Sequence, residues 1–170
     1  MVGIIAQEHD KSIACRKVKR LFVYGTLIDA SDTPAARWLR SRMRRAEGAS
    51  VPGRLVAIPT PRGWYPALVP APGSRVHGLC CTVALDACDL AWLDRYEGRE
   101  YRRVTARALL GATRATVQLY RWNGPLPPNA RAIPGGDFLN WLGRHGLRAY
   151  GIPARPKVAA RGGSRTHAVD

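Results

Sequence analysis

Short β-rich segments separated by turn residues constrain the fold of this chain more than any other feature of its sequence. Each segment is rich in branched or aromatic residues, and Gly, Pro or Asp residues interrupt the series at close intervals. The segments predicted to be strands are 21–24, 54–58, 67–69, 76–85, 101–110 and 115–122. Several short strands at this spacing predict an antiparallel or mixed sheet that curls toward a barrel.

Helix-start signals occur at three places along the chain. The run Asp32-Thr33-Pro34 offers an N-cap followed by a proline in the first turn, which predicts a helix over 34–45. Asp86 is the predicted cap of a second helix that runs to Tyr96, and Asp137 is the predicted cap of a third. The helices are therefore expected to be few and short beside the strands.

The length of 170 residues and the hydrophobic content of 46% predict one folded domain with a substantial core. No apolar run approaches the length of a membrane span, and the N-terminal residues lack a signal-peptide pattern. We expect an N-terminal extension over 1–19, the folded domain over 20–150 and a basic, disordered tail over 151–170. The proline- and glycine-rich stretch 123–136 is long enough to form a lid or wall of a site.

The net charge of +15 comes from 27 basic and 12 acidic residues, and it raises the alternative of a nucleic-acid-associated protein. The basic residues are spread along the chain, however, and no RNA-binding signature such as an aromatic RNP strand accompanies them. Arginine far outnumbers lysine, which a GC-rich coding bias explains without any function. Nucleic-acid binding through the basic surface is therefore an alternative that we do not favour.

The four cysteines do not follow a metal-binding or redox pattern. None belongs to a CxxC pair, and the adjacent Cys80 and Cys81 are expected to point to opposite faces of a strand. Together with Cys15 and Cys88 they are interpreted as buried or half-buried free thiols in a reducing compartment, without a metal. We therefore expect a cytoplasmic protein.

Two segments combine residue types suited to proton transfer on a small substrate. The strand 21–24 runs into Gly25, where exposed backbone N–H groups can bind a carboxylate or a developing oxyanion, and Tyr24 adds a hydroxyl. Glu97 lies at the predicted end of a helix, with Gly98 after it. The negative end of the helix dipole raises the pKa of a carboxyl group there, which suits a general base.

Each of these segments also has a simpler interpretation. A glycine after a strand often marks only a turn. Glu97 can form surface ion pairs with arginines nearby in the sequence, namely Arg95, Arg99 or Arg102. From local sequence alone these simpler interpretations are the commoner outcomes. A functional interpretation of the two segments therefore depends on whether other segments of the chain support it.

The segment FVYGTL at 22–27 resembles the opening motif of the γ-glutamylcyclotransferase-like superfamily, which includes the avirulence-induced plant proteins and γ-glutamylamine cyclotransferases. Further segments resemble the family's motifs in the same order: GRL at 53–55, WYPALVP at 64–70, VHG at 76–78, LDRYEG at 93–98, YRR at 101–103 and VQLYRW at 117–122. This conjunction is far more specific than any single motif. The resemblance implies an α+β fold with a small mixed, largely antiparallel, β-barrel-like core, a few flanking helices and a pocket at the end of the first strand.

The resemblance also implies roles for individual residues. It assigns to Glu97 the role of general acid and base. In the family a loop holds the γ-glutamyl group largely through its backbone, and this loop corresponds to Tyr24, Gly25, Thr26 and Leu27. The implied reaction is attack of the substrate's α-amine on its own γ-carbonyl, which releases 5-oxoproline and a free amine. Neither a metal nor an organic cofactor is required. Further candidates for the pocket are Tyr65, Tyr101 and Tyr120, each of which can instead be a packed strand aromatic.

The expected substrate is a γ-glutamyl amine or a γ-glutamyl-ε-lysine type compound, ahead of a γ-glutamyl dipeptide. No membrane partner is expected, and the sequence leaves the oligomeric state open. Because one fold can host different functions, the first alternative is a catalytically inactive or regulatory member of the same fold that binds a small carboxylate ligand. The second alternative is the nucleic-acid-associated protein described above.

Overall fold

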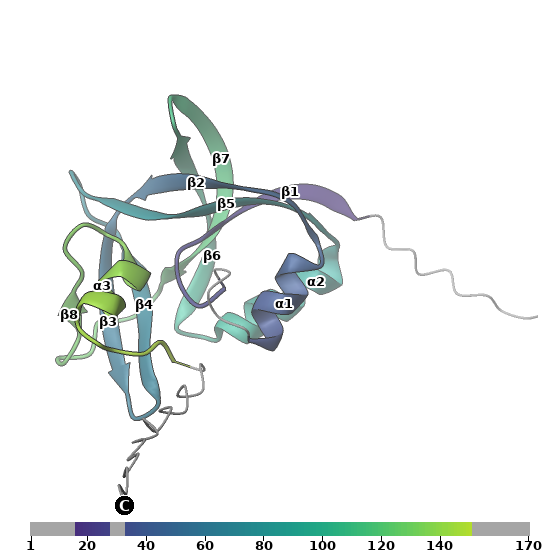
Figure 1. Ribbon diagram of the computed structural model, residues 1–170. Coiled ribbons are helices and arrows are strands. Elements are labelled where there is room, and N and C mark those ends of the chain that lie inside the picture. Colours follow the sequence, from purple (N-terminus) through teal and green to yellow (C-terminus); the bar gives the residue numbers. More distant parts are fainter. Residues whose placement is uncertain (1–15, 28–32, 151–170) are drawn as a thin grey trace, which may run out of the picture.

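The centre of the fold is a closed barrel, and the computed structural model describes residues 16–27 and 33–150 (Figure 1). In order around the barrel, its strands are β1 (Lys17–Val23), β5 (Arg75–Leu85), β2 (Met43–Pro52), β6 (Tyr101–Leu110) and β7 (Thr113–Trp122). Neighbouring strands are antiparallel except β7 and β1, which pair in parallel at Leu21 and Gln118 and close the barrel. The predicted α+β class with a mixed, largely antiparallel barrel is confirmed.

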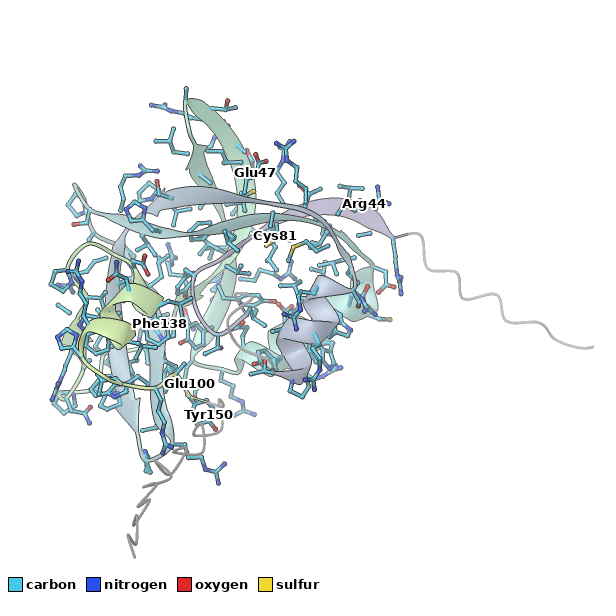
Figure 2. The ribbon with its side chains drawn as sticks, viewed as in Figure 1. Arg44, Glu47, Cys81, Glu100, Phe138 and Tyr150 are labelled. Carbon is cyan, nitrogen blue, oxygen red and sulfur yellow. The ribbon has the colours of Figure 1, made fainter. Side chains whose placement is uncertain are left out.

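A second, smaller sheet stands beside the barrel. Its strands, in spatial order, are β4 (Gly63–Val69), β3 (Arg54–Thr60) and β8 (Arg131–Ala132). Helix α3 (Phe138–Arg144) packs against this sheet, with the Trp64 and Trp141 rings edge to face at 5.4 Å, and Figure 2 shows Phe138 on this helix. The Asp137 carboxylate accepts a 3.0 Å hydrogen bond from the Asn140 N–H, so the predicted cap is confirmed.

Two further helices, α1 (Pro34–Arg40) and α2 (Ala87–Glu97), lie together against the barrel (Figure 1). The Thr33 hydroxyl caps α1 by accepting from the Ala36 N–H at 3.1 Å. Asp86 caps α2 in a reciprocal capping box with Asp89, as the cap prediction required. The indole rings of Trp38 and Trp92, 4.4 Å apart, join the two helices. No helix among residues 16–27 and 33–150 is long and apolar enough to cross a membrane.

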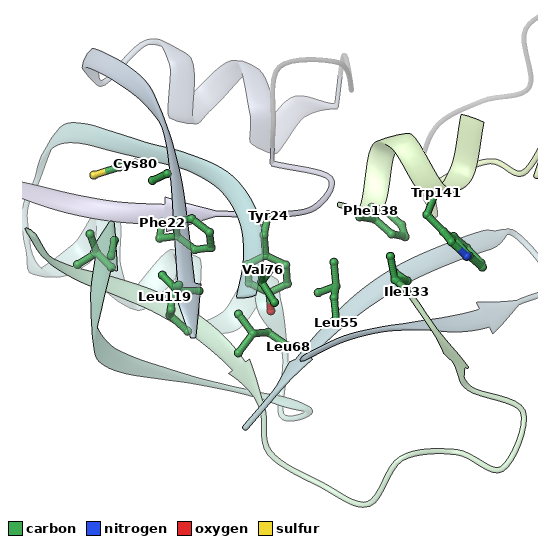
Figure 3. Close-up of a cluster of buried hydrophobic side chains, with 14 of the residues drawn as sticks. Phe22, Tyr24, Leu55, Leu68, Val76, Cys80, Leu119, Ile133, Phe138 and Trp141 are labelled. Carbon is green, nitrogen blue, oxygen red and sulfur yellow. The ribbon is translucent and has the colours of Figure 1, made fainter. Parts of the chain in front are cut away.

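The strands separate two hydrophobic clusters. The first lies between the barrel and the second sheet and includes Phe22, Leu55 and Cys80 (Figure 3). The second lies between the barrel and helices α1 and α2 and includes Leu39 and Cys81. Cys80 and Cys81 therefore point to opposite faces of β5 as buried free thiols, which confirms the prediction for this pair. Cys88 is an exposed free thiol on α2, so the expectation of a buried or half-buried thiol is wrong there. Burial raises the pKa of the Cys81 thiol to about 12.

The structure corrects several predicted boundaries, and the strand predicted over 67–69 starts already at Gly63. The helix expected over 34–45 ends at Arg40, and Met43 already pairs with Val83 in β2. Backbone pairing with β5 outweighs the helical pattern of these residues, which illustrates how tertiary context overrides local propensity. Gly48 and Pro52 lie within β2, a strand that the local pattern did not predict. Pro52 is the last residue of β2, so its missing N–H affects only the end of the strand.

The first strand also begins earlier than predicted. It starts at Lys17 instead of Leu21, and Lys17 pairs with Leu85 of β5. The barrel thus reaches into the segment expected as an N-terminal extension. Residues 1–15, including Cys15, and the predicted tail over 151–170 lie outside the described residues.

Candidate active site

A cavity of about 380 Å³ lies where β1 and α2 both end. All of the residues that the sequence singled out for the site line it: Tyr24, Gly25, Thr26, Leu27, Tyr65, Glu97, Tyr101 and Tyr120. Their roles in binding or catalysis stay predictions. The structure brings the first strand and the LDRYEG block together, although they are far apart in the sequence.

The loop 24–27 follows β1 and forms one wall of the cavity. At Gly25 this loop approaches β4 so closely that an added methyl group would lie 2.6 Å from the Pro66 Cγ atom. Only glycine fits such an approach without a shift of the loop or of the Pro66 ring. Because Gly25 lines the cavity and has no side chain, the backbone of the loop is itself part of the cavity wall.

The hydroxyl groups of two tyrosines bind backbone carbonyl groups beside the cavity. Tyr24 donates to the Tyr120 carbonyl oxygen at 2.6 Å, and Tyr101 donates to the Pro66 carbonyl oxygen at 2.7 Å. Burial is the main reason that the pKa of both phenols is raised, so both stay protonated. These phenols anchor the strands around the cavity, and their oxygen atoms remain acceptors.

Asp94 fixes α2 to the barrel one turn before Glu97. Its carboxylate accepts hydrogen bonds from Arg103 Nε at 2.8 Å and Nη2 at 3.1 Å, and from the Tyr120 hydroxyl at 2.7 Å. The hydrogen bond from Arg103 is the main reason that the pKa of Asp94 is lowered. Asp94 was not among the predicted site residues, although its place in the LDRYEG block was a signal.

Glu97 is the last residue of α2, and Gly98, with φ of 82°, ends the helix as predicted. Burial in the cavity raises the pKa of Glu97 to about 7. The predicted direction is confirmed, but the cause is loss of water around the carboxyl group rather than the helix dipole. Across residues 16–27 and 33–150, no ion pair joins Glu97 to an arginine, so the surface alternative is not observed.

Several other residues that line the cavity were missed by sequence reasoning: Thr60, Pro66, Tyr96, Glu100 and Tyr150. Tyr96 and Glu100 flank Glu97 in the sequence, which was a signal for both. Tyr150 reaches the cavity through pairing at the edge of β4, where its N–H donates to the Trp64 carbonyl oxygen at 2.7 Å. No pattern in the neighbouring sequence predicts that contact.

The predicted wall over 123–136 does not line the cavity. Part of that stretch is β8, which pairs with β3 on the second sheet. Trp122 also lies outside the lining, and its Nε1–H donates to the Pro125 carbonyl oxygen at 3.3 Å. Trp122 therefore anchors the proline-rich stretch, while its ring packs edge to face on Tyr101 at 5.4 Å.

This arrangement combines a carboxyl group that titrates near neutrality with a backbone wall and protonated phenols. Such a carboxyl group can both accept and donate a proton at pH 7. In the described part of the chain, no group of three or more His, Cys, Asp or Glu side chains is placed to hold a metal ion. The site is therefore described by its acid, its loop and its aromatic residues.

The fold and the site define a class of small barrel proteins with a half-buried acid, Glu97, beside a glycine-containing loop. The family described as gamma-glutamyl cyclotransferase, AIG2-like, matches residues 21–140. The chain belongs to this family, as its sequence motifs predicted. A comparison with curated proteins found no match.

Solved structures share the fold. YkqA from Bacillus subtilis has a TM-score of 0.60 and 20% identity over 76% of this chain, which spans 43% of that protein. A protein of Arabidopsis thaliana solved in solution has a TM-score of 0.54 and 26% identity, covering 76% of this chain and 83% of its own. An AIG2-like protein from Mus musculus has a TM-score of 0.56 and 20% identity, covering 81% and 99%.

Proposed function

We propose that this protein is a γ-glutamylcyclotransferase that converts a γ-glutamyl amine into 5-oxoproline and a free amine. The observation that carries the proposal is that Glu97, with a pKa of about 7, shares one cavity with the loop 24–27. Membership of the gamma-glutamyl cyclotransferase, AIG2-like family supports the same assignment. The proposed substrate is a γ-glutamyl amine or a γ-glutamyl-ε-lysine type compound, ahead of a γ-glutamyl dipeptide.

In the proposed reaction the Glu97 carboxylate takes a proton from the substrate's α-ammonium group. The freed amine attacks the γ-carbonyl carbon, a new C–N bond closes the five-membered ring, and the original amide C–N bond breaks. The α-nitrogen loses two protons as the lactam forms, and the departing nitrogen gains two as it becomes an ammonium ion. Glu97 carries protons between the two nitrogens, so solvent supplies no net proton.

The loop 24–27 is proposed to hold the γ-glutamyl group and to stabilise the oxyanion through backbone N–H groups. Gly25 suits this role because its missing side chain lets the loop pack against Pro66 beside the cavity. The pKa values of the Tyr24, Tyr101 and Tyr120 phenols are raised, and all three hydroxyl groups are hydrogen-bonded. We therefore propose that these tyrosines position other groups and do not transfer protons. Tyr65 is proposed to contact the departing group.

The test is to incubate the purified protein with a panel of γ-glutamyl amines and to measure the release of 5-oxoproline by mass spectrometry. Glu97→Gln should lower kcat by about 10²–10⁴-fold, which is the usual contribution of general acid–base catalysis. The matched control is Glu47→Gln, because Glu47 pairs with Arg45 at 3.0 Å and does not line the cavity. This control should leave kcat unchanged.

Two results would overturn the proposal. Equal rates for the wild type and Glu97→Gln would remove Glu97 from the reaction. Absence of product from every substrate, together with measurable binding of 5-oxoproline, would instead favour an inactive binding protein with the same fold. We expect the enzyme to act in the cytoplasm, where buried Cys80 and Cys81 stay reduced.

A further inference from the structure

The charge of the cavity is opposite to the charge of the protein. The chain carries a net charge of +15, yet none of the described residues that line the cavity is Lys, Arg or His. The acidic residues on the lining are Glu97 and Glu100. The acidic side chains attract a cation to their part of the cavity, and no basic side chain of the described lining offsets this attraction.

Glu100 is held at this cavity by the turn between α2 and β6. Its carbonyl oxygen accepts a 2.8 Å hydrogen bond from the Asn123 N–H, which fixes the backbone. Its carboxylate folds back over the end of α2, because a methyl group added to Gly98 would lie 2.9 Å from Glu100 Oε2. Within residues 16–27 and 33–150, no ion pair neutralises this carboxylate.

Tyr65 and Tyr150 complete an aromatic wall next to Glu100. Their rings meet edge to face with centroids 6.3 Å apart, and both residues line the cavity. Figure 2 shows Glu100 and Tyr150 near one another at the same end of the molecule. The pKa of the Tyr65 phenol is raised first by burial and then by the charge of Glu100, so the two side chains are close enough to interact. Electron-rich rings beside a carboxylate bind ammonium groups.

We propose that Glu100, Tyr65 and Tyr150 form a subsite for a second positive charge on the departing amine. The preferred substrates are then γ-glutamyl derivatives of diamines or of other amines that carry a further ammonium group. This inference rests on the proposed cyclotransferase reaction, and it names the leaving group that the reaction prefers. Glu100 and Tyr150 are exposed, whereas the loop 24–27 is more buried, so the subsite lies toward the solvent side of the reacting bond.

The experiment compares three γ-glutamyl amides whose leaving groups have similar length and different charge. These leaving groups are 1,5-diaminopentane, hexylamine and 5-aminopentanoate. We expect kcat/KM for the diamine amide to exceed that for the hexylamine amide about tenfold, with the 5-aminopentanoate amide lowest. The preference should weaken as the salt concentration rises, because the subsite is partly open to water.

Glu100→Gln should bring the ratio of kcat/KM between the diamine and hexylamine amides close to one. Glu47→Gln makes the same chemical change outside the cavity and should leave this ratio at the wild-type value. A wild-type enzyme that cyclises the hexylamine amide as well as the diamine amide would overturn the subsite and leave the cyclotransferase proposal standing. If Glu100→Gln leaves the ratio unchanged, the subsite is likewise overturned and the cyclotransferase proposal stands. If none of the three amides releases 5-oxoproline, the proposed function fails, and the subsite fails with it.

Discussion

The phenolic hydroxyl of Tyr24 donates a 2.6 Å hydrogen bond to the backbone carbonyl oxygen of Tyr120, which lies 96 positions later in the chain. The Tyr120 hydroxyl in turn donates to Asp94 of α2 at 2.7 Å. These two bonds link the loop after β1, the strand β7 and the helix that ends in Glu97. The loop and the acid are therefore held in one hydrogen-bonded network.

Tyr24→Phe should destabilise the protein by about 1–3 kcal/mol, because the Tyr120 carbonyl oxygen would be buried without its donor. Urea denaturation measures this change in the free energy of unfolding. The matched control is Tyr150→Phe, which removes an exposed hydroxyl and should change stability by less than about 0.5 kcal/mol. Equal stability of both variants would contradict the structural role of the Tyr24 hydroxyl.

Gly25→Ala should weaken both stability and catalysis, because the added methyl group would lie 2.6 Å from Pro66 Cγ. Relief of this clash moves the loop 24–27 away from β4, and overpacking of this kind typically costs about 1–3 kcal/mol. We expect kcat/KM to fall about tenfold or more as the loop loses its position. Gly111→Ala is a useful contrast for catalysis, since that glycine lies in the β6–β7 turn away from the cavity. Unchanged kcat/KM in Gly25→Ala would argue against substrate binding by the loop.

The pH dependence of kcat/KM should report the titration of Glu97. The base is the carboxylate, so kcat/KM should rise with pH through an apparent pKa of about 7. The residual activity of Glu97→Gln should lack this rising part of the pH profile. Any part of the profile that comes from titration of the substrate should be the same for the wild type and the variant. A limb centred near the ordinary carboxyl value of 4.5 would show that Glu97 is not desolvated.

Glu97 should also make the stability of the protein depend on pH. Its pKa is about 7 in the folded state, above the ordinary value of 4.5. Below the ordinary value both states hold the proton, so burial of the carboxyl group costs nothing electrostatic. Stability falls as the pH rises from the ordinary value to the folded pKa, because the unfolded state then gains from ionising a carboxyl group that the folded state keeps protonated. The loss is complete once the pH has passed the folded pKa.

Glu97→Gln removes that charge, so this variant should be more stable than the wild type at pH 8. We expect a difference of about 1–2 kcal/mol, reduced by partial contact of the carboxyl group with water. At pH 4 the two proteins should have nearly equal free energies of unfolding. Urea titrations at the two pH values measure both differences, and a variant that is less stable at pH 8 would contradict the raised pKa.

Elements with strong local signals were predictable from the sequence. Asp86 and Asp137 cap helices as expected, and the strands of the β6–β7 hairpin were found nearly in full. The predictions were wrong where long-range pairing competes with local preference. Met43 belongs to a segment with a helical pattern, yet it pairs with Val83 of β5 and begins strand β2.

The candidate site divides in the same way. Motifs along the chain pointed to Glu97 and to the loop 24–27, because these residues lie in short segments with distinctive chemistry. Glu100 and Tyr150 needed the structure, since their approach to the cavity depends on the turn after α2 and on the edge of β4. Asp94 likewise gains its positioning role only through Arg103 and Tyr120.

The sequence by itself determined the order of the elements, the family motifs and the presence of an acid at a helix end, because neighbouring residues carry those signals. Only the tertiary structure decided that Glu97 shares a cavity with Tyr24 and that loss of water raises its pKa. Burial is a property of residues that meet from distant segments, so no local pattern can specify it.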